Sequence, residues 1–131
     1  MFPMIYSRAA AQEKPLFDPT EFDNLIAMAG IDAVVNLADV FVSEARKRVA
    51  GIETAVNEVN LSAIEQETHA LGSSAGTFGA QRIHILARAA EAACVAGDQE
   101  IALSLSRDIL EVADESLNLA QAYIATLSEG K

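Results

Sequence analysis

The chain has 131 residues, of which 51% are hydrophobic, and a formal net charge of −10 at pH 7. This length suits one domain with its own hydrophobic core. The negative charge argues against binding to nucleic acid or to anionic membrane surfaces. No apolar run approaches the roughly 20 residues that a membrane-spanning helix needs, and the single cysteine excludes an internal disulfide. Because the N-terminus also lacks a signal-peptide pattern, we expect a cytoplasmic protein.

The N-terminal region, residues 1–17, shows no clear hydrophobic period and contains two prolines. We expect it to be an extension of the domain, partly packed through Phe2, Ile5 and Tyr6. The domain itself is assigned to residues 18–131.

The domain begins with signals for a short helix followed by a long one. Asp18 can cap the short helix, Pro19 suits its first position, and Gly30 ends it. Asp32 can cap the next helix, in which apolar residues recur every three or four positions as far as about Asn57.

Three further helices are predicted from their boundary signals. Ser62, followed three residues later by a glutamate, forms a capping box that opens one helix, and glycines near position 79 end it. The next spans 81–96, and Gly97 separates it from the last, 101–127, whose apolar residues fill half the circumference. Short connections make consecutive helices antiparallel neighbours. We therefore predict an all-α fold, an antiparallel up-and-down four-helix bundle with a short additional N-terminal helix.

The helix that contains His69 has one apolar face and one unusually bare polar face. At about 100° per residue, one arc of roughly 100° collects Leu61, Ile64, Thr68, Leu71, Ala75 and Phe78. His69 lies about 130° from the centre of this arc, on the solvent side. Its neighbours on the following turns are Gly72, Ser73 and Gly76, which are too small to cover an imidazole. Since glycine inside a helix costs roughly 1 kcal/mol against alanine, we interpret this patch as an access route for another protein's backbone.

The stretch from His69 to Ala80, HALGSSAGTFGA, resembles the motif H-x-L-K-G-S-S/A-x-x-x-G-A of histidine-containing phosphotransfer (HPt) domains. The resemblance implies that His69 accepts a phosphoryl group from a receiver-domain aspartate and passes it to another receiver domain in a two-component phosphorelay. Two positions depart from the motif. Gly72 replaces a lysine that in the family balances the phosphate's charge, and Ser73 replaces a glycine. Arg82 and Arg88 are candidates for the missing positive charge.

The resemblance also implies the partners. Receiver domains of response regulators, and a hybrid histidine kinase, would dock around His69 on a surface that we assign to Glu65, Gln66, Gly72, Ser73 and Gly76. The chain would be a monomeric phosphocarrier without a metal or cofactor of its own, because Mg²⁺ belongs to the receiver domain. No kinase activity is expected, since the chain has no G-x-x-x-x-G-K-S/T phosphate loop. Glu65 or Gln66, one turn before His69, could fix the imidazole tautomer, as could a backbone or water contact.

Two other functions remain compatible with the sequence. The first is a docking module that binds or sequesters a receiver domain without transferring phosphate, which the glycine at position 72 favours. The second is a scaffold bundle that dimerises through a heptad stripe of the last helix, Leu103, Leu110, Leu117 and Ile124.

The remaining reactive side chains receive structural interpretations. His84 shares a helical stripe with Arg88 and Glu91, so we expect it to be an ordinary residue of a polar face. Cys94 falls on an apolar face without an activating base, so we expect it in the core.

Overall fold

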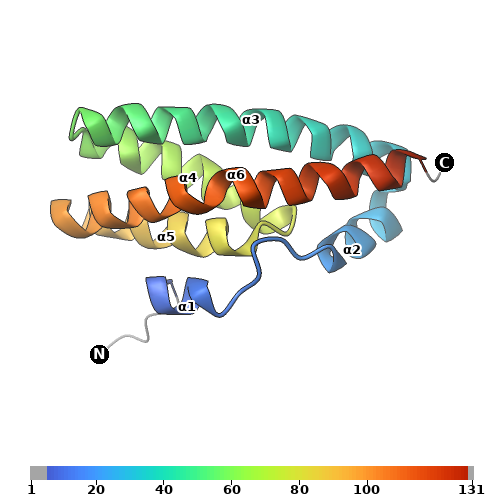
Figure 1. Cartoon of the computed structure of the whole chain (residues 1–131), viewed down its shortest axis with the longest axis horizontal. Coiled ribbons are helices and arrows are strands. Elements are labelled where there is room, and N and C mark those ends of the chain that lie inside the picture. Colours follow the sequence, from blue (N-terminus) through green and yellow to red (C-terminus); the bar gives the residue numbers. More distant parts are fainter. Residues whose placement is uncertain (1–5, 130–131) are drawn as a thin grey trace.

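The computed structural model describes residues 6–129, and every regular element in this range is a helix. Two short helices come first, α1 (Arg8–Gln12) and α2 (Thr20–Ala29). Four long helices follow, α3 (Ile31–Asn57), α4 (Leu61–Thr77), α5 (Gln81–Val95) and α6 (Gln99–Glu129). Figure 1 shows the long helices side by side, each running opposite to the one before it. The predicted all-α bundle is confirmed.

The four long helices pack as a closed ring of neighbours, with α3 on α4, α4 on α5, α5 on α6 and α6 on α3. The apolar faces predicted from periodicity meet in one core. Leu103, Leu117 and Ile124 of the heptad stripe are each at most 9% exposed, and Leu110 packs against the core from its edge. This stripe is therefore occupied within the bundle and is not available as a dimer interface.

Three helix starts differ from the sequence-based prediction. Pro19, and not Asp18, is the N-cap of α2, and the carboxylate of Asp18, one position earlier, accepts a hydrogen bond from the backbone N–H of Thr20 at 3.0 Å. Gly30, at φ 87°, turns the chain directly from α2 into α3, so Asp32 lies in the first turn of α3 and does not cap it. Asn60, whose side chain accepts a hydrogen bond from the backbone N–H of Ala63 at 3.1 Å, caps α4 in place of Ser62. Helices α3 and α4 begin earlier than predicted, each close behind a turn residue with positive φ, Gly30 before α3 and Val59 before α4.

The N-terminal segment is more ordered than its sequence suggests. α1 lies against α5, and Arg8 forms an ion pair with Asp108 of α6. The Ser116 hydroxyl of α6 donates a hydrogen bond to the carbonyl of Leu16 at 2.6 Å. Tyr6 packs on the bundle as expected, whereas Phe2 and Ile5 lie outside the described residues.

Asp18 fastens this segment to the turn between α4 and α5. Its backbone N–H donates to the carbonyl of Gly79 at 2.8 Å, and its carboxylate accepts from the side chain of Gln81 at 3.0 Å. Hydrogen bonds from Thr20 and then from Gln81 lower the pKa of Asp18. The turn between α4 and α5 is thus hydrogen-bonded to a residue that lies just before α2.

Within residues 6–129, none of the helices combines the length and the apolar character required to cross a bilayer.

Candidate functional site

His69 projects from the outer face of α4, with 65% of its side chain exposed. The opposite face of the helix is buried, and Ile64, Thr68 and Leu71 are each 0% exposed. The Thr68 hydroxyl donates to the carbonyl of Ile64 at 2.7 Å, so this buried polar group is satisfied within its own helix. The predicted separation between a core face and an exposed histidine is confirmed.

The imidazole of His69 is held by a carboxylate from the neighbouring helix. Its Nδ1 lies 2.7 Å from Oε2 of Glu91 on α5. The residue that positions the ring is therefore Glu91, and not Glu65 or Gln66 one turn earlier on α4. Glu91 is itself mostly shielded, with 23% of its side chain exposed, which strengthens a charge-assisted hydrogen bond.

This contact decides which ring nitrogen can react. An ionised carboxylate only accepts hydrogen bonds, so Nδ1 of His69 must carry a proton to bind Glu91. In the neutral ring the other nitrogen, Nε2, then keeps its lone pair. The site therefore presents the nucleophilic Nε2 on an exposed side chain, and the hydrogen bond from Nδ1 to Glu91 fixes the orientation of the ring.

Arg88 extends the same network. Its guanidinium donates to Oε1 of Glu91 at 3.0 Å and to the hydroxyl of Ser73 at 3.0 Å. Ser73 in turn donates to the carbonyl of His69 at 3.2 Å. Arg82 is engaged elsewhere, because it donates to backbone carbonyls of the N-terminal segment at 2.8–3.2 Å. Of the two candidates for the missing positive charge, Arg88 is the one beside His69.

The glycines of α4 do not form the predicted bare patch. Gly72 is buried, and a Cβ built on it would lie 3.4 Å from Ala87 and from the guanidinium of Arg88. A Cβ on Gly76 would lie 2.8 Å from Nδ1 of His84. Both glycines face α5 and allow its side chains to cross close to the α4 backbone. Of the predicted docking residues, Glu65, Gln66 and Ser73 are exposed.

His84 is a packing residue, and the prediction of an ordinary polar-face histidine is wrong. It is half-buried, and its Nδ1 lies 2.7 Å from the carbonyl of Gly72. Its ring also meets the ring of Tyr6 edge-on, with centroids 5.8 Å apart. These contacts occupy its Nδ1 and cover one side of its ring, unlike the open position of His69.

Two carboxylates near His69, Glu65 and Glu91, also act on the thiol of Cys94. Burial first, and then the charges of Glu65 and Glu91, raise the pKa of the Cys94 thiol to about 11. Cys94 is buried, as predicted, and stays protonated at neutral pH. Nowhere in the described part of the chain do three His, Cys, Asp or Glu side chains gather as a metal site would require.

Comparison with known proteins agrees with this geometry. Residues 27–129 match the family model described as "Hpt domain". The crystal structure of histidine-containing phosphotransfer protein B (HptB) from Pseudomonas aeruginosa PAO1 superposes with a TM-score of 0.76 over 86% of this chain and 96% of that chain. Sequence identity is 17%, so the superposition establishes a shared fold. No curated protein sequence gives a significant match. The family match spans most of the chain, including His69 and Glu91, and the chain therefore belongs to the Hpt domain family, whose role is histidine phosphotransfer in phosphorelays.

Proposed function

We propose that His69 accepts a phosphoryl group from the aspartyl phosphate of a receiver domain and passes it to the aspartate of a second receiver domain. The observation that carries this proposal is the 2.7 Å contact between Nδ1 of the exposed His69 and Glu91. Catalysis of phosphoryl transfer depends mainly on positioning and on charge stabilisation. The contact positions the nucleophile Nε2 and places a carboxylate against the ring proton.

The transfer balances without release of a proton. The Nε2 lone pair attacks phosphorus, the bond from phosphorus to the aspartate oxygen breaks, and the aspartate leaves as a carboxylate. The ring becomes a phosphorylated imidazolium, and the proton on Nδ1 stays in its hydrogen bond to Glu91. In the second transfer, an aspartate of the next receiver attacks phosphorus, the nitrogen–phosphorus bond breaks, and His69 returns to its neutral form. Mg²⁺ bound by the receiver neutralises charge on the phosphoryl oxygens in both steps.

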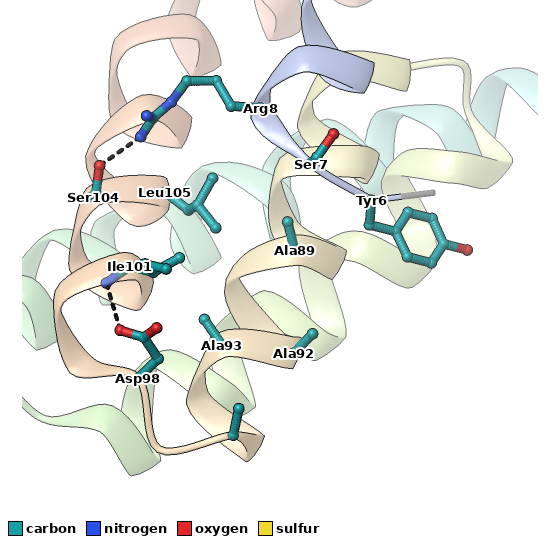
Figure 2. A pocket seen from close by; sticks show the side chains of 11 residues that line it. Tyr6, Ser7, Arg8, Ala89, Ala92, Ala93, Asp98, Ile101, Ser104 and Leu105 are labelled. Carbon is teal, nitrogen blue, oxygen red and sulfur yellow. Dashed lines mark hydrogen bonds between the residues drawn. The ribbon is translucent and has the colours of Figure 1, made fainter. Parts of the chain in front are cut away.

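An apolar groove beside His69 is the proposed contact surface for the receiver. This α5 groove has a volume of about 430 Å³ and is lined by Tyr6, Arg88, Glu91, Ala92, Val95 and Ala96. Arg88 and Glu91 also form the network around His69, so a receiver whose aspartate reaches Nε2 would lie beside this groove. A second recess shares Tyr6, Ala92 and Ala96 and continues between α5 and α6. Figure 2 shows Ala92 on its α5 side, and Ile101 and Leu105 on its α6 side.

Replacing Val95 with aspartate tests this surface. Val95 is 72% exposed, so the bundle should fold normally, but a charge buried unpaired at the interface should weaken receiver binding by about 10-fold or more. The dissociation constant can be measured by calorimetry. The matched control is Val40→Asp on α3, which is 59% exposed and adds the same charge. Equal affinity of both variants would exclude the groove from the interface.

The proposed function is tested by label transfer from a phosphorylated receiver domain of the same cell. The wild type should gain an acid-labile, base-stable phosphoryl group, and His69→Gln should gain none, because it lacks the nucleophilic nitrogen. His84→Gln, with its fold verified by circular dichroism, should still be labelled.

The glycine at position 72 favours a second function, a docking module that binds a receiver without transfer. In the same experiment this module would bind the receiver with wild-type sequence and with His69→Gln, while neither protein became labelled. That result would overturn the proposed carrier role.

A further inference from the structure

A phosphoryl group on His69 would add negative charge beside a carboxylate on a chain that is already strongly negative. The phosphoryl oxygens carry roughly 1.5 to 2 negative charges at neutral pH, offset only in part by the proton that stays on the ring, next to Glu91 and on a chain of net charge −10. The family's usual compensating lysine is absent, because position 72 is glycine. A phosphorylated His69 therefore needs a cation from elsewhere in the fold.

Arg88 has the right position and the right connections. Its two terminal nitrogens each lie 3.0 Å from an acceptor, one on Glu91 and the other on Ser73. Ser73 is one turn beyond His69 on the same face of α4, so the guanidinium spans the site. Among the ion pairs of residues 6–129, the carboxylate of Glu91 pairs with both His69 and Arg88, so Arg88 is the cation that this network places beside the imidazole.

Gly72 leaves room beside the guanidinium of Arg88. A Cβ there would lie 3.4 Å from Cζ and Nε of Arg88, at the short end of ordinary van der Waals contact, so that a longer side chain would meet the guanidinium. A lysine would place its stem against the guanidinium and a second ammonium beside it. The glycine, which on its own costs about 1 kcal/mol in a helix interior, thus leaves the space that Arg88 occupies.

We infer that Arg88 is the phosphate-binding cation of this protein, reaching across from α5 to neutralise the phosphoryl group on His69, and that Gly72 is the compensating change. The inference rests on the proposed phosphorylation of His69. On phosphorylation, the guanidinium would exchange its neutral Ser73 acceptor for phosphoryl oxygens. Arginine suits this exchange because its planar fork can bind two oxygens at once.

The test uses phosphoramidate, which transfers its phosphoryl group to an exposed imidazole with release of ammonia and requires no partner protein. Phosphorus NMR across a pH titration then measures the second proton dissociation of the phosphoryl group on His69. A nearby cation favours the dianion, so Arg88→Ala should raise the pKa of the phosphoryl group, with about a 3- to 10-fold lower acid dissociation constant. Arg88→Lys should keep most of the wild-type value.

Two further variants make the result specific. Adding Gly72→Lys to Arg88→Ala should restore the wild-type dissociation constant, which a purely structural role of Arg88 would not predict. Arg46→Ala, which removes a cation bound to Asn118 and Gln121 of α6, should leave the constant unchanged. An unaltered constant in Arg88→Ala, or an equal change in Arg46→Ala, would overturn the inference. If the wild type accepted no label from a receiver, the proposed function would be refuted. The test of Arg88 would still stand, because phosphoramidate labels His69 without a receiver.

Discussion

Replacing Glu91 with alanine should slow phosphoryl acceptance by His69 on the order of 10- to 100-fold, as for other carboxylates that orient a functional histidine. Without the carboxylate, the proton on Nδ1 loses its acceptor 2.7 Å away, and the ring can rotate and exchange tautomers. Part of the population would then carry its proton on Nε2, the nitrogen that must attack. The rate should be measured at saturating receiver concentration, so that docking does not limit it.

The tautomer gives a second readout that simple destabilisation would not move. Nitrogen NMR of the imidazole should show the proton on Nδ1 in the wild type and a shift toward Nε2 in Glu91→Ala. Glu91→Gln should lie between the two, because its amide oxygen can still accept the hydrogen bond without a charge. Glu65→Ala is the matched control, since Glu65 is an exposed carboxylate one turn from His69 on α4. If Glu65→Ala slowed acceptance as much as Glu91→Ala, Glu91 would have no special role.

Replacing Gly79 with alanine should destabilise the bundle by about 2 to 4 kcal/mol, from the left-handed backbone conformation and the loss of the hydrogen bond between Asp18 and Gly79. Gly79 has φ 81°, and a Cβ there would lie 2.2 Å from the carbonyl oxygen of Asp18. The backbone of Asp18 would have to move, breaking its 2.8 Å hydrogen bond to the Gly79 carbonyl. Against the 5–15 kcal/mol that typically stabilises a domain, this is a large loss.

Urea unfolding of Gly79→Ala and Gly97→Ala separates the two causes. Gly97 has a similar φ of 74°, yet nothing lies within 4 Å of its Cβ position. Gly97→Ala should therefore cost only the conformational term, about 1 to 2 kcal/mol. Equal losses in the two variants would mean that the contact between Asp18 and the α4–α5 turn contributes nothing.

The α4–α5 turn matters for function because it determines which residues of the two helices meet. Antiparallel helices bring together positions at equal distances from the turn between them. His69 and Glu91 each lie eleven residues from Ala80, and Gly76 and His84 each lie four residues from it. Both pairs are in contact or in contact range in the structure. Applied to the sequence, this rule would have pointed to Glu91 instead of Glu65 or Gln66.

Sequence alone was sufficient for helices α2 to α6, the core faces and the position of His69, but not for α1, which lies in a segment without a clear hydrophobic period. These features depend on local spacing, because apolar residues every three or four positions define a helix face and glycine or a capping side chain marks its ends. The same local reasoning placed Cys94 in the core and His69 on the surface. It failed at Asp18, Asp32 and Ser62, none of which occupies the N-cap position of the helix that it was expected to open.

Only the tertiary structure decided how the surroundings of His69 are built. A helical wheel treats each helix as isolated, so it placed Gly72 and Gly76 on an open surface, whereas α5 covers them. It also could not show that Glu91 and Arg88, about twenty residues away along the chain, supply the hydrogen bond and the positive charge beside the imidazole. The physical reason is that a helix's own sequence sets where its side chains point, but the neighbouring helix decides what they meet.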